Sequence, residues 1–389
     1  MTTHVFIVDD NTFKYHLEYM FAGTGAKDKI IDFNNTKNSQ LHHSSEAGLV
    51  GMMADGCRVR KDDLIIFYVQ EESKKHEGLF FGIFQATENG IFLDNNDKKQ
   101  FLKKELKKSL TFRLRIKPYQ TERTRITEVY PCGVTEWEAL DEIKNICHPN
   151  QMLWSLIYRK LKGNRGNTMI TIYESERLFD LIREKNNNAP LNCKNTSLSY
   201  DSNNCTIITS KESFDYIGRQ EEINIFPRLM EKYNSGKAHE AHLQMYITQN
   251  LGCGTNKSLD EALGINNKSI EWLGNEVSCG VGMQRIDVMF SIEESETQRY
   301  LFPIELKAVP ASEDNTRQLT RYIDWIEQYY KPNRISTIQP VLICKKGKTI
   351  SNNVKKTFYE FNKRKGILPL KYIEYEIKNF EIVFNNERY

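Results

Sequence analysis

Two neighbouring stretches near the middle of the C-terminal half alternate apolar and polar residues with period two. The first, starting at residue 285, reads Arg-Ile-Asp-Val-Met-Phe-Ser-Ile, so Ile, Val and Phe share one face and Arg, Asp and Met the other. The second, ending at residue 307, reads Arg-Tyr-Leu-Phe-Pro-Ile-Glu-Leu-Lys. This alternation is typical of β-strands. The pattern predicts a β-hairpin over residues 285–307, with its turn in the polar run 293–298.

The segments around this hairpin carry a helical period. Leu319, Tyr322, Ile323 and Ile326 recur at i, i+3, i+4 and i+7, which is typical of an amphipathic helix. Residues 216–234 and 239–250 give further predicted helices. The remaining predicted elements are a strand at 276–281, a strand at 340–344, a helix at 354–365 and strands at 371–377 and 380–384. Together they predict an α/β fold, with a mixed sheet flanked by helices.

The N-terminal half is richer in closely spaced strands. The predicted strands are 4–8, 64–69, 79–86, 90–93, 110–116 and 168–173. The predicted helices are 12–21, 136–146, 152–161 and 174–184, and residues 22–46 are predicted to be a loop. Strands at this spacing favour a small β-barrel or a strongly curved sheet, so we predict an α+β domain.

A polar stretch rich in Asn and Ser separates the two halves. With 389 residues, the chain has a suitable length for two domains. We therefore predict a first domain over residues 1–185, a linker over 186–215 and a second domain over 216–389.

The predicted hairpin carries a candidate catalytic set. Glu305 and Lys307 are two residues apart, so they share one face of a strand, and Asp287 lies on the partner strand. Carboxylate oxygens are the ligands that Mg²⁺ prefers, and a lysine can orient a water or stabilise charge on a phosphate. The alternative is that these charged residues only close a surface strand.

The order of the predicted elements in the C-terminal half resembles that of a known protein family. It is a helix with an acid, a strand with Asp, a strand with Glu-x-Lys and a helix with Gln-x-x-x-Tyr, and it resembles the PD-(D/E)XK nuclease superfamily over roughly residues 216–389. The Gln-x-x-x-Tyr element resembles the RecB-type branch, and Ile-Glu-Leu-Lys with Gln-Leu-x-Arg-Tyr is similar to NucS-type DNA nucleases. No Pro precedes the Asp of the first strand. The residues that match the family motifs are Glu240, Asp287, Glu305, Lys307, Gln318 and Tyr322.

The resemblance implies a role for each residue. Asp287 and Glu305, with the carbonyl of Leu306, are expected to bind Mg²⁺, with Mn²⁺ as a substitute. Lys307 is expected to orient or activate the attacking water.

The two helices complete the implied site. Glu240 is expected to hold a water next to the first metal, or a second metal, and Glu221 and Glu222 are alternatives for this helical acid. Gln318 and Tyr322 are expected to support the lysine or the scissile phosphate.

The N-terminal half also shows a resemblance. Asp-Asp-Leu-Ile-Ile-Phe-Tyr-Val, a turn, and Gly-Leu-Phe-Phe-Gly-Ile-Phe resemble PUA-like barrels, which include the EVE, ASCH, YTH and SRA groups, over about residues 1–185. Such barrels bind nucleic acid, and several hold a flipped, modified base in an aromatic pocket. The resemblance implies Tyr68, Tyr130, Trp137 and Trp154 as pocket walls. The alternative is that these aromatic residues belong to the core.

Basic residues gather between residues 98 and 125, although the whole chain has a formal net charge of only +3. This stretch suits contacts with DNA phosphates. The alternative is a solvated helix over 99–108 beside a strand edge protected by charge. A second basic cluster starts at residue 159. The candidate DNA-binding residues are Lys103, Lys104, Lys107, Lys108, Arg113, Arg115, Arg159, Lys160 and Arg165.

Several function classes are disfavoured. The sequence has no apolar run of 18 residues and no secretory signal, so we expect a cytoplasmic protein without a membrane partner. It lacks the Gly-x-x-x-x-Gly-Lys-Ser/Thr motif of a nucleotide triphosphate site. The eight cysteines include no Cys-x-x-Cys pair, so we expect neither a structural zinc nor a disulfide framework.

The sequence thus predicts a metal-dependent endonuclease that hydrolyses phosphodiester bonds in double-stranded DNA. A base-sensing domain joined to a nuclease suits modification-dependent restriction, in which the sensor flips one nucleotide. The first alternative is a NucS-like mismatch or repair endonuclease. The second, from another class, is a non-catalytic nucleic-acid-binding protein on a nuclease scaffold. Because a double-strand cut needs two active sites, we expect a homodimer.

Overall fold

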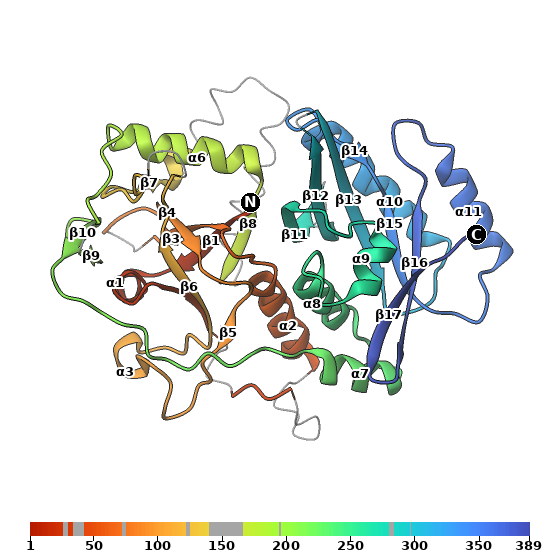
Figure 1. Ribbon diagram of the computed structural model, residues 1–389, viewed down its shortest axis with the longest axis horizontal. Helices are drawn as coiled ribbons and strands as arrows, with labels where there is room; N and C mark the ends of the chain where they lie inside the picture. The colour runs from red at the N-terminus through yellow and green to blue at the C-terminus, as the bar shows by residue number, and fades with distance from the viewer. Residues whose placement is uncertain are drawn as a thin grey trace. The chain divides into compact units, whose positions relative to one another are not determined.

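The computed structural model divides into two compact units of mixed α/β structure (Figure 1). The first unit comprises residues 1–32 and 55–223, and the second comprises residues 33–54 and 224–389. Residues 33–54 therefore belong to the second unit, although residues of the first unit precede and follow them. The structure describes residues 1–25, 30–33, 43–71, 75–121, 125–139, 166–193, 196–279, 284–295 and 297–389.

An eight-stranded mixed sheet forms the first unit, in the order β2-β6-β4-β3-β1-β8, with β5 paired to β6 and β7 to β4. Strands β1 and β3 are parallel, and the other pairs are antiparallel. The predictions at 4–8, 64–69 and 79–86 are confirmed. The bounds are β1 Thr3–Val8, β2 Phe21–Thr24, β3 Leu64–Val69, β4 Leu79–Ala86, β5 Phe92–Leu93, β6 Phe112–Pro118, β7 Val134–Thr135 and β8 Asn167–Ile170.

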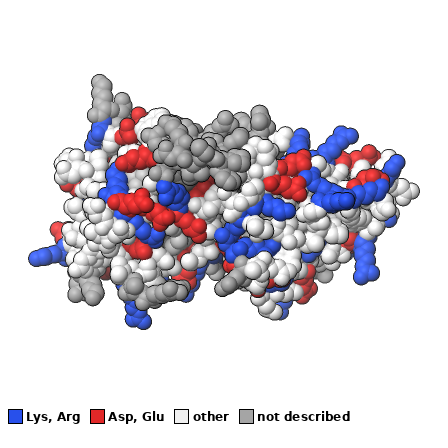
Figure 2. All heavy atoms as spheres, turned by 90° about the horizontal axis from the view of Figure 1, so that it is seen from above, with Lys and Arg blue, Asp and Glu red and all other residues white. Residues whose placement is uncertain are grey.

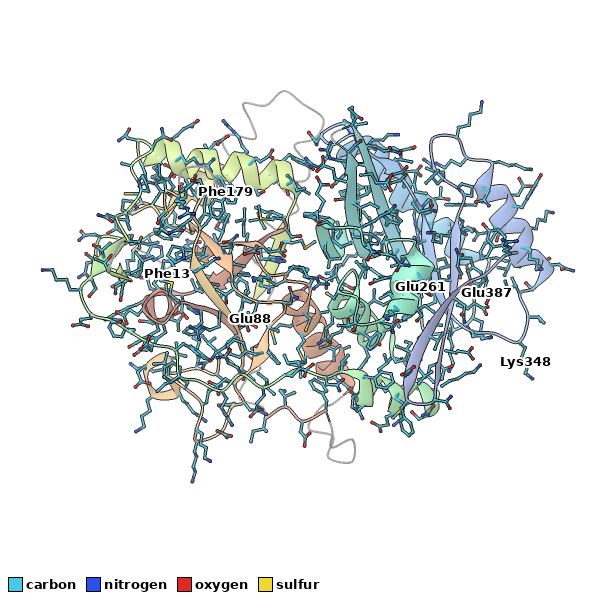
Figure 3. All side chains as sticks on the ribbon, viewed as in Figure 1. Phe13, Glu88, Phe179, Glu261, Lys348 and Glu387 are labelled. Carbon is cyan, nitrogen blue, oxygen red and sulfur yellow. The ribbon has the colours of Figure 1, made fainter. Side chains whose placement is uncertain are left out.

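Both faces of this sheet are covered. Helix α1 (Asp10–Glu18) and the hairpin of β9 (Ser197–Asp201) and β10 (Thr206–Ser210) pack on one face. Helix α6 (Ile172–Lys185) packs on the other. Phe13 from α1 and Phe179 from α6 belong to these two separate clusters of buried residues (Figure 3). The sheet is therefore buried on both sides, which explains its nearly continuous apolar strands.

Two predictions for the N-terminal half are wrong. The predicted linker 186–215 contains the β9–β10 hairpin, because Leu198, Tyr200 and Ile207 bury their side chains against the sheet despite their polar neighbours. The predicted loop 22–46 contains β2 and the start of helix α2 (His43–Cys57). The helix that the alternative interpretation placed at 99–108 is limited to α3 (Lys103–Leu106), which is flanked by residues with positive φ angles. Residues 140–165, which include most of two predicted helices, lie outside the described residues.

A seven-stranded mixed sheet forms the second unit, in the order β11-β12-β13-β15-β16-β17, with β14 paired to β13. Strands β13, β15 and β16 run parallel, and the outer pairs β11–β12, β12–β13 and β16–β17 are antiparallel. The predicted hairpin 285–307 is confirmed as β12–β13. The bounds are β11 Ile270–Ser278, β12 Arg285–Ser295, β13 Gln298–Lys307, β14 Thr337–Ile338, β15 Val341–Lys345, β16 Lys371–Lys378 and β17 Glu381–Asn386.

Helices flank this second sheet. Helices α7 (Phe226–Asn234), α8 (Glu240–Asn250) and α9 (Lys257–Leu263) bury apolar side chains against one face, to which Val288, Phe290 and Leu306 point. Helix α10 (Asp314–Trp325), continued by the π-helix η2 (Ile326–Tyr330), contacts β13, and α11 (Asn352–Asn362) contacts α10. In the described part of the chain, every helix is too short or too polar to span a lipid bilayer.

Stacking fixes the register of the central hairpin. Phe290 and Phe302 are directly opposite each other on β12 and β13, and their rings stack with centroids 4.4 Å apart. Val288 pairs with Ile304 in the same register. Aromatic pairs across two strands stabilise one register over others, so the residues beyond this pair also have fixed neighbours.

Candidate active site

Asp287, Glu305 and Lys307 meet where the β12–β13 ladder ends. Because Val288 pairs with Ile304, the next position outward places Asp287 opposite Glu305. Leu306 points to the other face and is fully buried in the core. The alternation predicted from the sequence therefore brings the two carboxylates and the lysine onto one face of the sheet.

Main-chain contacts hold Asp287 in place. The backbone N–H of Leu306 donates a hydrogen bond to Asp287 Oδ2 at 2.8 Å. The side-chain amide of Gln244, on α8, donates to the carbonyl oxygen of Asp287 at 2.6 Å. Burial raises the pKa of Asp287 well above its usual range, and the nearby Glu305 and Glu240 carboxylates raise it further. Ionised Asp287 is therefore repelled by the neighbouring carboxylates, and Lys307 offsets this repulsion only in part.

Glu305 is almost completely buried and has a partner on each oxygen. The Tyr322 hydroxyl donates to Glu305 Oε2 at 2.6 Å, and Lys307 Nζ forms an ion pair with Oε1. Burial and the two carboxylates raise the pKa of Tyr322, so its hydroxyl stays protonated and can donate. Burial lowers the pKa of Lys307, but Glu305, Glu240 and Asp287 raise it more, so the ammonium stays charged.

Glu240 is the first residue of α8 and reaches the same site. Its Oε2 lies 3.9 Å from Lys307 Nζ, and its side chain is half exposed. Burial raises the pKa of Glu240, and Glu305 adds to this effect while Lys307 opposes it. Neither alternative, Glu221 or Glu222, leads a helix, because α7 begins only at Phe226 and Glu221 forms a β-bridge with Leu93.

Helix α10 supplies the remaining predicted residues and one that was not predicted. Gln318 lies one turn before Tyr322 and is half-buried. Arg321 is exposed and acts on the pKa of the buried Cys279 thiol. Burial raises this pKa to about 12, with Glu305 raising and Arg321 lowering it. Arg321 and Glu305 thus act electrostatically on the same thiol, with opposite sign. Only the position of Arg321 beside Tyr322 could have indicated this.

The donor set fits a hard divalent cation. Within the described residues, no three His, Cys, Asp or Glu side chains are grouped so that they could hold a metal by themselves. Mg²⁺ commonly binds through one or two carboxylates together with waters and substrate oxygens. Asp287 and Glu305 supply two carboxylates, and the repulsion that raises the pKa of Asp287 is what a cation would relieve.

The residues predicted to form an aromatic pocket lie in different environments. Tyr68 and Tyr130 are 3% and 4% exposed and belong to the core of the first unit, as the alternative interpretation proposed. The hydroxyl of Tyr68 donates to the carboxylate of the buried Glu136. Trp137 is exposed, and Trp154 lies outside the described residues.

The predicted basic residues of the first unit have different roles. Lys103, Lys104 and Lys107 are exposed on and beside α3, and Lys108 forms an ion pair with Asp9. Half-buried Arg115 lies over the ring of Tyr216 at 5.0 Å. Arg159, Lys160 and Arg165 lie outside the described residues. Figure 2 shows acidic and basic side chains interspersed on the face that it displays.

The prediction that Arg113 contacts DNA is wrong. Its side chain is fully buried, and its guanidinium forms an ion pair with Asp94 at 3.1 Å. It also donates to the carbonyl oxygens of Leu110 and Phe101, both at 2.7 Å. A buried guanidinium with these partners stabilises the fold and is not available to a phosphate.

Comparisons with known proteins leave the family open. No protein-family model matches the chain, and no curated protein matches it. Among solved structures, a hypothetical protein from Leishmania major aligns with 48% of this chain and 96% of its own chain, at 8% identity and a TM-score of 0.28. A likeness this low indicates neither the fold nor the function of this chain.

Proposed function

We propose that the second unit is a metal-dependent nuclease that hydrolyses phosphodiester bonds in DNA. The observation that carries this proposal is the convergence of Asp287, Glu305 and Lys307 at the end of one hairpin. A buried and a half-buried carboxylate held side by side oppose folding, and such arrangements cluster at functional sites.

The order of elements supports the same proposal. Along the chain, α8 carries Glu240, β12 carries Asp287, β13 carries Glu305 and Lys307, and α10 carries Tyr322. This is the order expected from the resemblance to the PD-(D/E)XK superfamily. Both flanking helices reach the site, since Lys307 lies near Glu240 and Tyr322 donates to Glu305.

In this proposal, Asp287, Glu305 and the Leu306 carbonyl would hold Mg²⁺ or Mn²⁺, which supplies charge neutralisation and a water of lowered pKa. Lys307 stays cationic, so it orients the attacking water and stabilises charge on the phosphate rather than accepting a proton as a neutral amine. Tyr322 fixes the orientation of Glu305, and Gln318 is placed one turn away to support the phosphate.

The test is DNA cleavage by the Asp287→Asn variant with Mg²⁺ or Mn²⁺. The amide keeps the size of the side chain and can still accept the Leu306 hydrogen bond, but it removes a charged ligand. We expect cleavage to fall by at least about 100-fold. The control is Asp314→Asn, which removes an exposed carboxylate on α10 and should leave cleavage unchanged. Cleavage by Asp287→Asn at the wild-type rate would contradict the assignment of Asp287 as a metal ligand.

The biological role we propose is modification-dependent restriction, performed by a homodimer so that both strands are cut. Plain duplexes, duplexes with 5-methylcytosine, 5-hydroxymethylcytosine or 6-methyladenine, and duplexes with one mismatch separate the candidates. Cutting of one modified duplex alone supports restriction, and cutting at the mismatch supports repair. Binding without cleavage of any duplex supports a non-catalytic binder on a nuclease scaffold.

A further inference from the structure

A groove with a cavity volume of about 710 Å³ opens beside the candidate active site, within the second unit. Three segments line it: residues 236–240, which lead into α8, residues 308–310, which directly follow Lys307, and Lys345–Lys346 at the end of β15. Glu240 therefore belongs both to the groove wall and to the surroundings of Lys307. A substrate strand that reaches Lys307 has this groove next to it.

The topology of the sheet explains why these segments meet. Strands β13 and β15 are parallel, and Lys307 pairs with Cys344, so both strands end at the same edge. Lys345 then follows at the position beside residue 308. The loops beyond the two strands are packed together, since a Cβ added at Gly347 would lie 3.3 Å from Pro310 Cβ. The groove wall is therefore built from the same strands that position the catalytic residues.

The lining is cationic. Lys237, Lys345 and Lys346 face a single carboxylate, Glu240. Lys237 is exposed, and in the described part of the chain no carboxylate lies within ion-pair distance of it. Lys345 Nζ lies 3.8 Å above the ring of Tyr233, a contact that orients the ammonium without neutralising it.

The third lysine is paired only in part. Lys346 Nζ lies 3.1 Å from Glu376 Oε1, but the same carboxylate also binds Lys378 at 2.7 Å. Glu374 and Glu387 also raise the pKa of Lys346, so the cationic character of the lining comes mainly from Lys237 and Lys345. An anionic ligand would complement this surface better than a neutral one.

We propose that this groove holds the sugar-phosphate backbone of the DNA strand next to the phosphate that is cut, with Lys237, Lys345 and Lys346 contacting phosphates. The inference rests on the proposed nuclease function and deepens it by placing the substrate strand. Lysine side chains are long, mobile point charges, which suit contacts that do not depend on base sequence. The groove is therefore a sequence-independent track, and recognition of particular bases lies elsewhere.

The test is binding of the full chain to a plain DNA duplex in EDTA, followed by fluorescence anisotropy over a range of salt concentrations. Each phosphate contact contributes about 0.9 to the slope of log K against log salt. We expect Lys237→Gln and Lys346→Gln each to reduce this slope by about 0.9 and to weaken binding about threefold at moderate salt.

The matched control is Lys378→Gln. Lys346 and Lys378 bind the same Glu376 carboxylate, but only Lys346 lines the groove. Loss of either lysine therefore costs the fold a similar exposed ion pair, and only loss of Lys346 removes a predicted phosphate contact. An unchanged slope in Lys378→Gln, with equal melting temperatures for all variants, completes the expected result.

Other outcomes separate the groove from the enzyme. Unchanged slopes in Lys237→Gln and Lys346→Gln, while the wild type binds and cuts DNA, overturn the groove proposal and leave the nuclease standing. If both variants show reduced slopes but the wild type does not cleave DNA, the groove proposal is supported and the nuclease proposal is contradicted. Absence of DNA binding by the wild type overturns the groove proposal, as does equal weakening by Lys378→Gln.

Discussion

At the residue scale, Asp287 shows how the requirements of folding and of the candidate chemistry oppose each other. Its carboxylate is desolvated and faces Glu305, and the hydrogen bond from Leu306 offsets only part of this cost. The raised pKa of Asp287 shows that burial and repulsion outweigh this hydrogen bond. A raised pKa means that the folded protein favours the neutral form of Asp287. Charge at this position thus destabilises the metal-free fold.

Asp287→Asn should therefore stabilise the metal-free protein while it removes cleavage. We expect the free energy of unfolding to rise by about 1–2 kcal/mol, because the amide removes like-charge repulsion and keeps the side-chain volume. The measurement is urea denaturation in EDTA, with Asp314→Asn as the exposed control. Mg²⁺ should then stabilise the wild type and not the variant. A loss of stability in Asp287→Asn would contradict this account.

At the element scale, one buried carboxylate of helix α2 contacts helices α7 and α8 within the second unit. Glu46 accepts hydrogen bonds from Arg228 at 2.8 Å and from His242 at 2.8 Å, and Lys232 Nζ lies 3.3 Å away. Burial alone would raise the pKa of Glu46, but the bonds from His242 and Arg228 hold it well below its ordinary value of 4.5. The same helix that carries Glu240 and Gln244 thus contacts α2 through His242.

Glu46→Gln should destabilise the protein by about 2–4 kcal/mol at neutral pH, because it leaves buried cations without their acid. A depressed pKa contributes stability that is present above about pH 4.5 and is lost as the pH falls below it. The difference between wild type and variant should therefore shrink below that pH. Urea denaturation at several pH values measures it, and a difference that is constant with pH would refute the assignment.

The control for this prediction is Glu360→Gln. Glu360 pairs with Lys363, and both side chains are more than half exposed. Exposed pairs contribute about 0–1 kcal/mol, so this variant should unfold almost like the wild type.

At the scale of the whole molecule, the two units do not follow the order of the chain. Residues 33–54 belong to the second unit, so the predicted domain 216–389 lacks a segment of its own fold (Figure 1). In that fragment, Arg228, Lys232 and His242 lose the carboxylate of Glu46. Integrity of the candidate active-site unit thus depends on a helix from the N-terminal half.

A fragment of residues 216–389 should consequently be less stable than the same unit in the full chain, by about 3–5 kcal/mol. A peptide of residues 43–57 added in trans should raise its melting temperature, measured by circular dichroism. The same peptide with Glu46→Gln is the matched control and should raise it less. A fragment as stable as the full-length protein and insensitive to the peptide would show that α2 is dispensable.

The sequence by itself determined the features that depend on local periodicity. The hairpin β12–β13 and the shared face of Asp287, Glu305 and Lys307 follow from strand period two, which needs no knowledge of distant segments. Helix α10 follows in the same way from its apolar stripe. Helix α2 was missed because its sequence holds three glycines, which disfavour a helix until tertiary packing stabilises it.

Only the tertiary structure decided what each charged side chain does. Arg113 and Lys107 lie in one basic stretch, yet Arg113 is buried against Asp94 and Lys107 is exposed. Glu46 meets its partners on α7 and α8 across more than 180 residues of chain. Such outcomes depend on which distant segments supply a counter-charge and exclude water. The free energy of a buried charge depends both on its counter-charge and on the exclusion of water. The local spacing of residues along the chain carries no information about either.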